Sequence, residues 1–410
     1  MSKFIEHAFS TTGTRILLMS MSFVQGIIIT RYLLPEGRGF IAVYLAIVNM
    51  ILPFSELGIK QSSSYYLSKV QIPLYDIINI QTITLIFSTL LTWIILFVVF
   101  YLQELLDPFV ILMLFLSIPL RIYVSFSIGI ALAKRKINTI NIVQFLLVAV
   151  DLLSVVLLFM VFHLEVKYYF FAYFFSSLIG SIYIFLWLLK TYQVTFWVNL
   201  KKYKEQSLPI VKKGITYALP LFVIGLNYSV DIFLLNFYVD KAEIGIYAVG
   251  VTFAILLWQL PNILSLLIFS YSVSTINENQ FSLNLWNKTK NIMIMMIPIA
   301  IAITLVAKYV IPLLYGATFS RSFDVLMWLM PGVYMMVIFK LLNGDLAARG
   351  YPMIAFYIFS FGAILNIVLN VLLIPAIGIN GAAIASSISY SLSAVIFLIQ
   401  YYRKVIGIKL

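Results

Sequence analysis

Cysteine is absent from this sequence of 410 residues, and charged residues are scarce at 10%. Without cysteine the chain has no disulfide, no thiol nucleophile and no thiolate metal site. About a quarter of the residues in a soluble protein are charged, so there is too little charge here to cover a water-facing surface. Hydrophobic residues make up 63% of the chain and the mean hydropathy is +1.05. The surrounding solvent is therefore lipid.

Histidine occurs only twice, as His7 and His163, which lie far apart in the sequence. We therefore expect no metal site. The first residues, MSKFIEHAFSTTGTR, lack the pattern of a signal peptide, so the first apolar helix is expected to be retained as a membrane anchor. The net charge of +12 is better explained by basic cytoplasmic loops than by nucleic acid, because no soluble basic domain is present to bind it.

Long apolar runs recur along the whole chain. A membrane-spanning helix needs about 20 apolar residues, and β-strands are excluded because the runs are continuous rather than alternating. The predicted spans number twelve: 14–34, 40–59, 77–101, 108–132, 139–162, 168–189, 214–239, 244–273, 289–313, 323–344, 353–375 and 380–402. The fold class expected is an all-α membrane protein.

The lysines and arginines between these spans predict the orientation. With the N-terminus inside, 19 of the 27 basic residues fall on the cytoplasmic side and 6 on the opposite side. Basic loops face the cytoplasm, so both termini are expected there, which also requires an even number of spans. The one long connection, residues 190–213, alternates lysines with apolar residues. It is predicted to be an amphipathic segment at the surface of an anionic leaflet.

The two halves of the sequence repeat. A shift of 206 residues superposes one set of like residues, and a shift of 215 superposes a second set. The pairs are Tyr32 with Tyr238, Gly39 with Gly245, Ala42 with Ala248 and Val43 with Val249 in the first set, and Ala133 with Ala348, Lys134 with Arg349, Asp151 with Asn366, Leu157 with Leu372 and Leu158 with Leu373 in the second.

Each half has six spans, so the two halves start on the same side of the membrane and the repeat is parallel. We expect two six-helix bundles around a central cleft, an arrangement typical of transporters that rock between inward-open and outward-open states. The predicted domains are an N-terminal bundle at 1–189, the interfacial linker at 190–213 and a C-terminal bundle at 214–410.

Four motifs stand out in the first loop, at the end of the second span, in the eighth span and near the C-terminus: LLPEGRGFIAVYLAIVNM, PFSELGIKQSSSYYLSK, IGIYAVGVTFAILLWQLPNILSLLIFSYSVS and LAARGYPMIAFYIFSFGAILNIVLNVLLIPAIGINGAAIASSISY. These motifs resemble the polysaccharide flippases of the multidrug/oligosaccharidyl-lipid/polysaccharide exporter superfamily. The resemblance runs through nearly the whole chain and is weakest over residues 77–130.

The resemblance implies a function in the bacterial cytoplasmic (inner) membrane. Members of this family flip an undecaprenyl-pyrophosphate-linked oligosaccharide, such as an O-antigen or capsule repeat unit, to the outer leaflet. It also implies a secondary-active carrier of the antiporter type rather than an enzyme, with a polysaccharide polymerase and a chain-length regulator as partners. No cofactor is expected apart from H⁺ or Na⁺ as the coupling ion.

Three basic residues are candidates for binding the pyrophosphate, because charges inside a membrane mark transport pathways. Arg121 lies mid-span, and a guanidinium can bind phosphate with two hydrogen bonds; the alternative is a structural ion pair with Asp151 or Asp231. Arg15 begins the first span and is alternatively an interfacial anchor. Lys340 lies in the tenth span and is alternatively neutralised by Asp345.

Two carboxylates, Asp151 and Asp231, lie inside the fifth and seventh spans and are candidates for ion coupling. The alternative for each is a hydrogen bond between helices. Pro35 and Gly37 are predicted to make the turn after the first span. Span-interrupting prolines, expected to kink their helices, occur at Pro119, Pro220, Pro261 and Pro298.

Two other functions fit parts of the sequence less well. A drug or cation exporter of the same superfamily would need an acidic pocket, whereas Arg121 favours an anionic substrate. A polysaccharide polymerase or membrane glycosyltransferase would need a large external loop or an acidic metal-binding motif, and neither is evident in the sequence.

Overall fold

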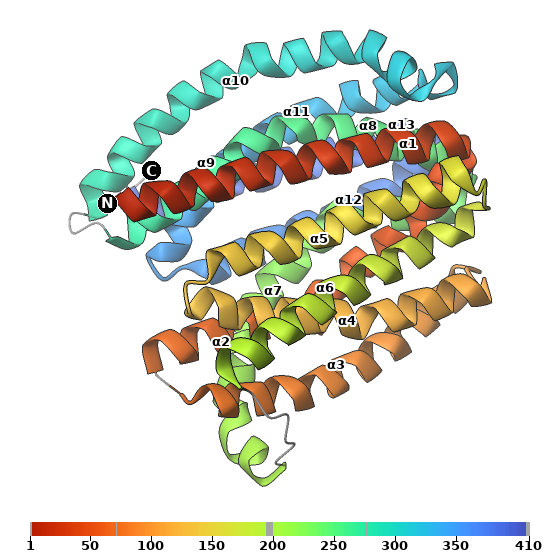
Figure 1. Cartoon of the computed structure of the whole chain (residues 1–410). Helices are drawn as coiled ribbons and strands as arrows, with labels where there is room; N and C mark the ends of the chain where they lie inside the picture. Colours follow the sequence, from red (N-terminus) through yellow and green to blue (C-terminus); the bar gives the residue numbers. More distant parts are fainter. Residues whose placement is uncertain (1, 71, 194–199, 275–277, 407–410) are drawn as a thin grey trace. The chain divides into compact units, whose positions relative to one another are not determined.

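The computed structural model describes residues 2–70, 72–193, 200–274 and 278–406, and every element in that part of the chain is helical. The α-helices, drawn in Figure 1, are α1 (Ser2–Ser55), α2 (Ile59–Tyr65), α3 (Leu74–Leu102), α4 (Pro108–Ala133), α5 (Ile137–Val155), α6 (Tyr169–Tyr192), α7 (Leu200–Tyr238), α8 (Lys241–Ala254), α9 (Gln259–Ser274), α10 (Glu278–Tyr315), α11 (Ser322–Ala348), α12 (Pro352–Ile377) and α13 (Ile379–Tyr401). Short 3₁₀ turns are η3 (Val166–Tyr168), η4 (Ile255–Trp258) and η5 (Ala317–Phe319), and π-turns are η1 (Tyr66–Val70), η2 (Val156–Val161) and η6 (Tyr402–Ile406).

The described residues contain 11 helical segments long and apolar enough to cross a membrane. The first, Gly13–Val70, has 58 residues, more than twice the length that one crossing needs. It is broken at Leu34, whose backbone has φ 59° and ψ −176°, and it contains both of the first two predicted spans. The all-α membrane fold with about twelve spans is therefore confirmed.

The break after the first span follows from Pro35. Proline disfavours helical backbone in the residue before it, and Leu34 leaves the helical region. Proline is well suited to the first turn of the next helix. The prediction that Gly37 also forms the turn is wrong, because Gly37 lies inside the helix that follows.

The interrupting prolines differ in their effect. Pro261 lies in the first turn of α9, three residues after the 3₁₀ turn η4 ends, and the eighth predicted span is divided into α8, η4 and α9. Pro119, Pro220 and Pro298 lie inside continuous helices. Figure 1 shows α10, which contains Pro298 and Pro312, as a long bowed helix.

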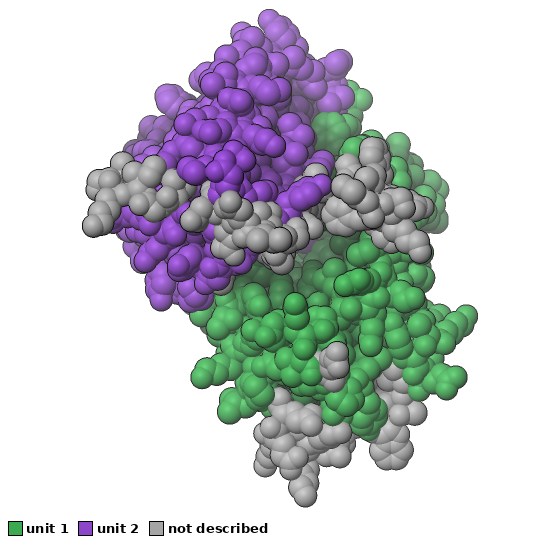
Figure 2. Space-filling model, turned by 90° about the vertical axis from the view of Figure 1, so that its left-hand side faces the viewer, with its two compact units in different colours: residues 1–32, 47–222 green, residues 33–46, 223–410 purple. Residues whose placement is uncertain are grey.

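The chain forms two compact units, coloured in Figure 2. Unit 1 comprises residues 1–32 and 47–222, and unit 2 comprises residues 33–46 and 223–410. The predicted bundles 1–189 and 214–410 remain a prediction, as does the interfacial linker 190–213, of which residues 194–199 lie outside the described part. The helix that contains the seventh predicted span, α7, begins earlier than that span, at Leu200.

Unit 1 is organised around α4, which packs against α2, α3 and α6, while α5 packs against α6. Its buried apolar cluster joins α4, α5 and α6 through Val124, Ile128, Ala131, Ile140, Val143 and Ile184. Glycine allows the closest approaches. A Cβ at Gly129 would lie 2.4 Å from the Lys60 carbonyl oxygen, and one at Gly58 would lie 2.0 Å from that of Gly214. Small residues at such crossings let helices pack tightly in lipid.

Unit 2 is organised around α11, which packs against α8, α9, α10 and α13. Its tightest crossing is between the segment 33–46 and α8. A Cβ at Gly39 would lie 1.7 Å from the Lys241 carbonyl oxygen, and one at Gly245 would lie 2.0 Å from that of Pro35. Gly39 and Gly245 are equivalent under the shift of 206 residues, so positions that correspond in the repeat also meet in space.

Replacing Gly39 or Gly245 by alanine should force these helices apart. We expect each change to destabilise the protein by about 1–3 kcal/mol, the usual cost of overpacking, measured as a lower unfolding temperature in detergent. Gly26→Ala is the matched control, because nothing lies within 4 Å of a Cβ at that position. Equal stability of the Gly39→Ala and Gly26→Ala proteins would contradict the close crossing.

Candidate functional site

Arg121 on α4 is held by two side chains of α6 in unit 1. Its Nε donates a 2.9 Å hydrogen bond to Oγ of Ser177. The centre of the guanidinium stands 3.6 Å from the centroid of the Tyr173 ring, an arrangement that stabilises the cation through the face of the aromatic ring. Ser177 in turn donates to the backbone carbonyl of Tyr173 over 2.6 Å, so its hydroxyl is itself held in place.

Asp151 on α5 interacts electrostatically with Arg121. No acidic side chain in the described residues lies within ion-pair distance of Arg121. Gln25 on α1 donates from Nε2 to Oδ2 of Asp151 over 2.8 Å. The other oxygen, Oδ1, is buried and has no hydrogen-bond partner in the described part of the chain. Arg121 and Asp151, which the sequence indicated separately, therefore belong to one polar group with Gln25, Tyr173 and Ser177.

Asp231 on α7 has a different environment in unit 2. It is 3% exposed and accepts hydrogen bonds from three side chains. Tyr247 on α8 donates over 2.6 Å, Asn370 on α12 donates over 3.0 Å, and Ser386 on α13 donates through its hydroxyl. Both carboxylate oxygens are engaged, so Asp231 joins four helices, which is the structural role that the sequence left as the alternative.

The two carboxylates occupy exchanged positions of the repeat. The shift of 206 residues pairs Gln25 with Asp231, and the shift of 215 pairs Asp151 with Asn366. Gln25 and Asp151 share a direct hydrogen bond in unit 1. In unit 2, Asn370 donates both to Asp231 and to Asn366. The acid is thus on the fifth helix of the first half and on the first helix of the second half.

Lys340 on α11 lies against aromatic rings rather than a carboxylate. Its Nζ is 4.2 Å from the ring centroid of Trp258 and 5.4 Å from that of Tyr228. Trp258 ends the 3₁₀ turn η4, and its indole N–H donates to the Val333 carbonyl over 2.8 Å. The alternative in which Asp345 neutralises Lys340 is wrong, because Asp345 has other partners.

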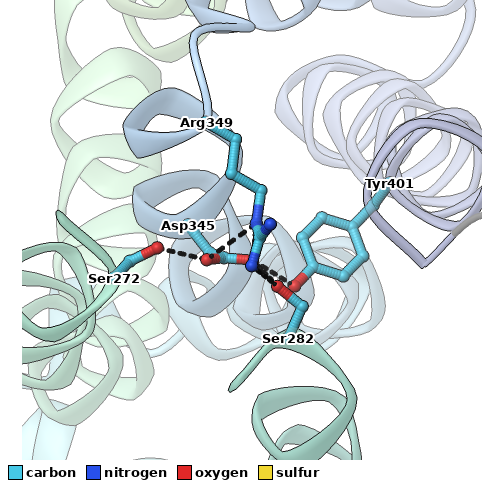
Figure 3. Close-up of polar contacts among 5 residues, drawn as sticks. All are labelled: Ser272, Ser282, Asp345, Arg349 and Tyr401. Carbon is cyan, nitrogen blue, oxygen red and sulfur yellow. Dashed lines mark hydrogen bonds and ion pairs between the residues drawn. The ribbon is translucent and has the colours of Figure 1, made fainter. Parts of the chain in front are cut away.

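Those partners form a buried cluster that sequence reasoning missed (Figure 3). Ser272 on α9, Ser282 on α10 and Tyr401 on α13 donate to the carboxylate of Asp345, the last two over 2.6 Å each. Arg349, which directly follows α11 and lies four residues after Asp345, forms an ion pair with Asp345 at 3.3 Å. Asp345 is fully buried, and the cluster ties together the ends of four helices in unit 2.

The spacing of Asp345 and Arg349, four residues apart, is the one signal of this cluster in the sequence. Serine and tyrosine are too common in the chain for their part in it to be foreseen. Arg15, the remaining candidate, is half-buried near the start of α1, and its role at the cytoplasmic mouth stays a prediction.

A family model described as "Polysaccharide biosynthesis protein" matches residues 4–268. A curated relative, the "Uncharacterized membrane protein MJ1375" of Methanocaldococcus jannaschii, is 41% identical over 64 residues, which is 16% of this chain. The match spans only 15% of the length of that relative.

Solved transporter structures share the whole fold. An inward-facing "multidrug resistance MATE family transporter of the MOP superfamily" has a TM-score of 0.76 at 13% identity, covering 95% of this chain and 94% of the other. "Lipid II flippase MurJ" has a TM-score of 0.78 at 16% identity, with coverage of 97% and 87%. A MOP superfamily transporter from Pyrococcus furiosus, described by the reversed polarity of its binding pocket, has a TM-score of 0.70 at 14% identity, with coverage of 97% and 95%. At these identities the likeness shows the fold.

Arg349→Met should leave the buried Asp345 carboxylate without its counter-charge. We expect a loss of about 3–5 kcal/mol of stability, typical of removing one partner of a buried pair, seen as a lower unfolding temperature. Glu165→Gln is the control, because it breaks the exposed pair of Glu165 with Lys167 and exposed pairs contribute little. If the two variants melted alike, the cluster would not stabilise unit 2.

Proposed function

Since the chain belongs to the polysaccharide biosynthesis protein family and has the fold of MOP-superfamily transporters, we propose that it is a secondary-active flippase. Its substrate in this proposal is an undecaprenyl-pyrophosphate-linked oligosaccharide, moved by alternating access from the cytoplasmic to the outer leaflet. The protein is a transporter and not an enzyme in this proposal. A polysaccharide polymerase and a chain-length regulator are its partners.

The main observation in support of the proposal is that neighbouring side chains hold the guanidinium of Arg121 in place. The Nε of Arg121 donates a hydrogen bond to Ser177, and the Tyr173 ring lies against one face of the guanidinium. The two terminal nitrogens have no hydrogen-bond acceptor among the described residues. An arginine held this way presents the edge that binds a phosphate group with two parallel hydrogen bonds. Placing a fixed positive charge inside a bilayer is costly, and an anionic substrate offsets that cost.

A polar sugar head cannot cross the hydrocarbon unaided, because each unsatisfied polar group costs several kcal/mol there. The carrier must therefore supply polar contacts to the head while the prenyl tail stays in lipid. Lys340 beside Trp258 and Tyr228 and Arg15 at the start of α1 are the further cations proposed to contact the substrate.

An exporter of drugs or other cations is the second candidate, because transporters described as multidrug carriers share the fold. Arg121 argues against it, since a cationic substrate would be repelled. The Pyrococcus furiosus relative is described as having a binding pocket of reversed polarity and a different function. This fold therefore accommodates pockets of either polarity, which supports an anionic substrate for a chain with a cationic site.

Complementation of a bacterial strain lacking its own polysaccharide flippase tests the function, with surface polysaccharide as the measured product. We expect the wild-type chain to restore export with at least one lipid-linked repeat unit. Arg121→Ala and Arg121→Lys should each reduce export by about tenfold or more, because one hydrogen bond to a charged group contributes about 1.5–3 kcal/mol. Arg403→Ala, on an exposed position near the C-terminus, should export normally. Normal export by the Arg121→Ala protein would reject the pyrophosphate site.

The proposed orientation places the protein in the bacterial cytoplasmic membrane with both termini in the cytoplasm. Because the chain has no cysteine, single cysteines can be introduced and labelled without removing native ones. In intact cells, a membrane-impermeant maleimide should label Glu165→Cys, on the loop proposed to face outward, and should not label Lys136→Cys, on the loop between α4 and α5. Both positions are exposed. The reverse labelling pattern would invert the topology.

A further inference from the structure

A groove of about 380 Å³ lies between α10 and α11 in unit 2 and is lined by residues of these two helices. Its walls include Ile297, Ile301, Thr304, Met327, Met330 and Tyr334. The hydroxyl of Thr304 donates to the carbonyl of Ala300 over 2.9 Å, and that of Tyr334 donates to the carbonyl of Met293 over 3.0 Å. Neither hydroxyl has a proton left to donate, so the groove suits a hydrocarbon chain and not a polar ligand.

The face of α10 that forms the groove also carries a lysine. Residues on this face follow one another at intervals of three or four, the spacing of one side of a helix: Trp286, Lys290, Ile294, Ile297 and Ile301. The three isoleucines are exposed. At 1.5 Å per residue, Lys290 lies about 10 Å along the axis from Ile297, where the groove begins. A hydrocarbon chain spans half of the bilayer core, about 15 Å, so a lipid with its headgroup at Lys290 reaches the groove.

Lys290 is placed by aromatic rings and keeps its charge free. Its Nζ is 5.1 Å from the ring centroid of Trp286, and the Trp286 ring packs edge-on against Tyr402 of η6 at 5.1 Å. Lys290 is exposed, and no carboxylate in the described part of the chain forms an ion pair with it. Tryptophan and tyrosine concentrate at the level of lipid headgroups. The cation therefore stands where the phosphate of a lipid lies.

We propose that Lys290 and the groove together bind one anionic phospholipid, with its phosphate at Lys290 and one acyl chain along α10 in the groove. Basic residues at the membrane surface attract anionic lipids. In the proposed orientation this end of α10 lies in the cytoplasmic leaflet. The chain restores the close carbon contacts that an unfilled apolar groove lacks, and the flexible side chains of Met327 and Met330 can adapt to its shape.

The single lysine favours a phospholipid over the transported lipid as the occupant. A phosphodiester headgroup such as that of phosphatidylglycerol carries one negative charge, which one lysine neutralises. The diphosphate of the proposed substrate carries at least two. Lys288, the other lysine nearby on α10, lies two residues from Lys290 and therefore on a different face of the helix. The proposed site does not depend on the flippase function.

The headgroup contact is tested with the full-length protein in detergent, by measuring the affinity for added lipid with native mass spectrometry. Dioleoyl phosphatidylglycerol and dioleoyl phosphatidylcholine have the same chains and differ in net charge. We expect the wild-type protein to bind the phosphatidylglycerol about fivefold more tightly, the effect of one lysine at the membrane surface. Lys290→Gln should abolish that preference. Lys288→Gln, which removes an equally exposed lysine from another face, should retain it.

The groove is tested with a second pair of variants. Ile301→Trp should fill the groove and weaken the binding of dioleoyl phosphatidylglycerol by about threefold, because close carbon contacts are lost. Ile299→Trp is the matched control, since Ile299 is exposed but does not line the groove. Dihexanoyl phosphatidylglycerol has chains too short to reach Ile297. It should bind equally to the wild-type and Ile301→Trp proteins.

The comparison of the two dioleoyl lipids on the wild-type protein needs no variant to fold. Equal affinities for them would overturn the proposal. Equal effects of Lys290→Gln and Lys288→Gln would also overturn it, and would reduce Lys290 to one of the basic residues that set the orientation. If farnesyl diphosphate displaced the phosphatidylglycerol, the groove would belong to the transported lipid instead. A failure of complementation would reject the flippase function and leave these affinities unchanged.

Discussion

Every polar side chain that this chain places in the membrane must find its partners inside the protein, because lipid offers none. The buried carboxylates show how strictly this holds. Asp231 receives three donors and Asp345 receives three hydroxyls and a guanidinium. These contacts come from different helices in each case, so satisfying one acid fixes the packing of several spans. Asp151 differs from these two acids, because its Oδ1 is buried without a hydrogen-bond partner in the described residues.

Most of the fold could be predicted because its determinants are local. A span is a continuous apolar run, so the prediction 108–132 falls within one residue of the observed Pro108–Ala133. The break at Leu34 could also be located, since Pro35 acts on its immediate neighbour. The division of the eighth span also has a local cause, because Pro261 lacks the N–H that would bond the carbonyl four residues earlier, at Leu257 in η4. The start of α7 was less predictable, because this helix begins at Leu200 in a lysine-rich stretch that hydropathy assigns to water.

The candidate site was predictable as a set of residues but not as an arrangement. Arg121, Asp151 and Lys340 stand out because charges in apolar runs are rare. Their neighbours do not, since Ser177, Tyr173 and Trp258 are of types that occur throughout the chain. The repeat supplies part of the missing information. It pairs Gln25 with Asp231 and Asp151 with Asn366, and in each unit the residues so paired lie in one hydrogen-bonded group. Both units thus have a polar link between the same two helices of the repeat, but the carboxylate is on the fifth helix in the first half and on the first helix in the second half.

The grouping of residues 33–46 with unit 2 has a consequence for how the molecule can be divided. Residues 33–46 belong to unit 2, residues 47–222 belong to unit 1, and the chain from residue 223 onward belongs to unit 2. Neither unit is therefore a continuous stretch of polypeptide. A fragment ending near the midpoint would carry Gly39 without Gly245, and its complement would carry Gly245 without Gly39. Each half of the sequence therefore supplies one side of this glycine crossing. A hybrid protein that takes one half from a relative must preserve the crossing before its transport sites can be compared with those of the parent.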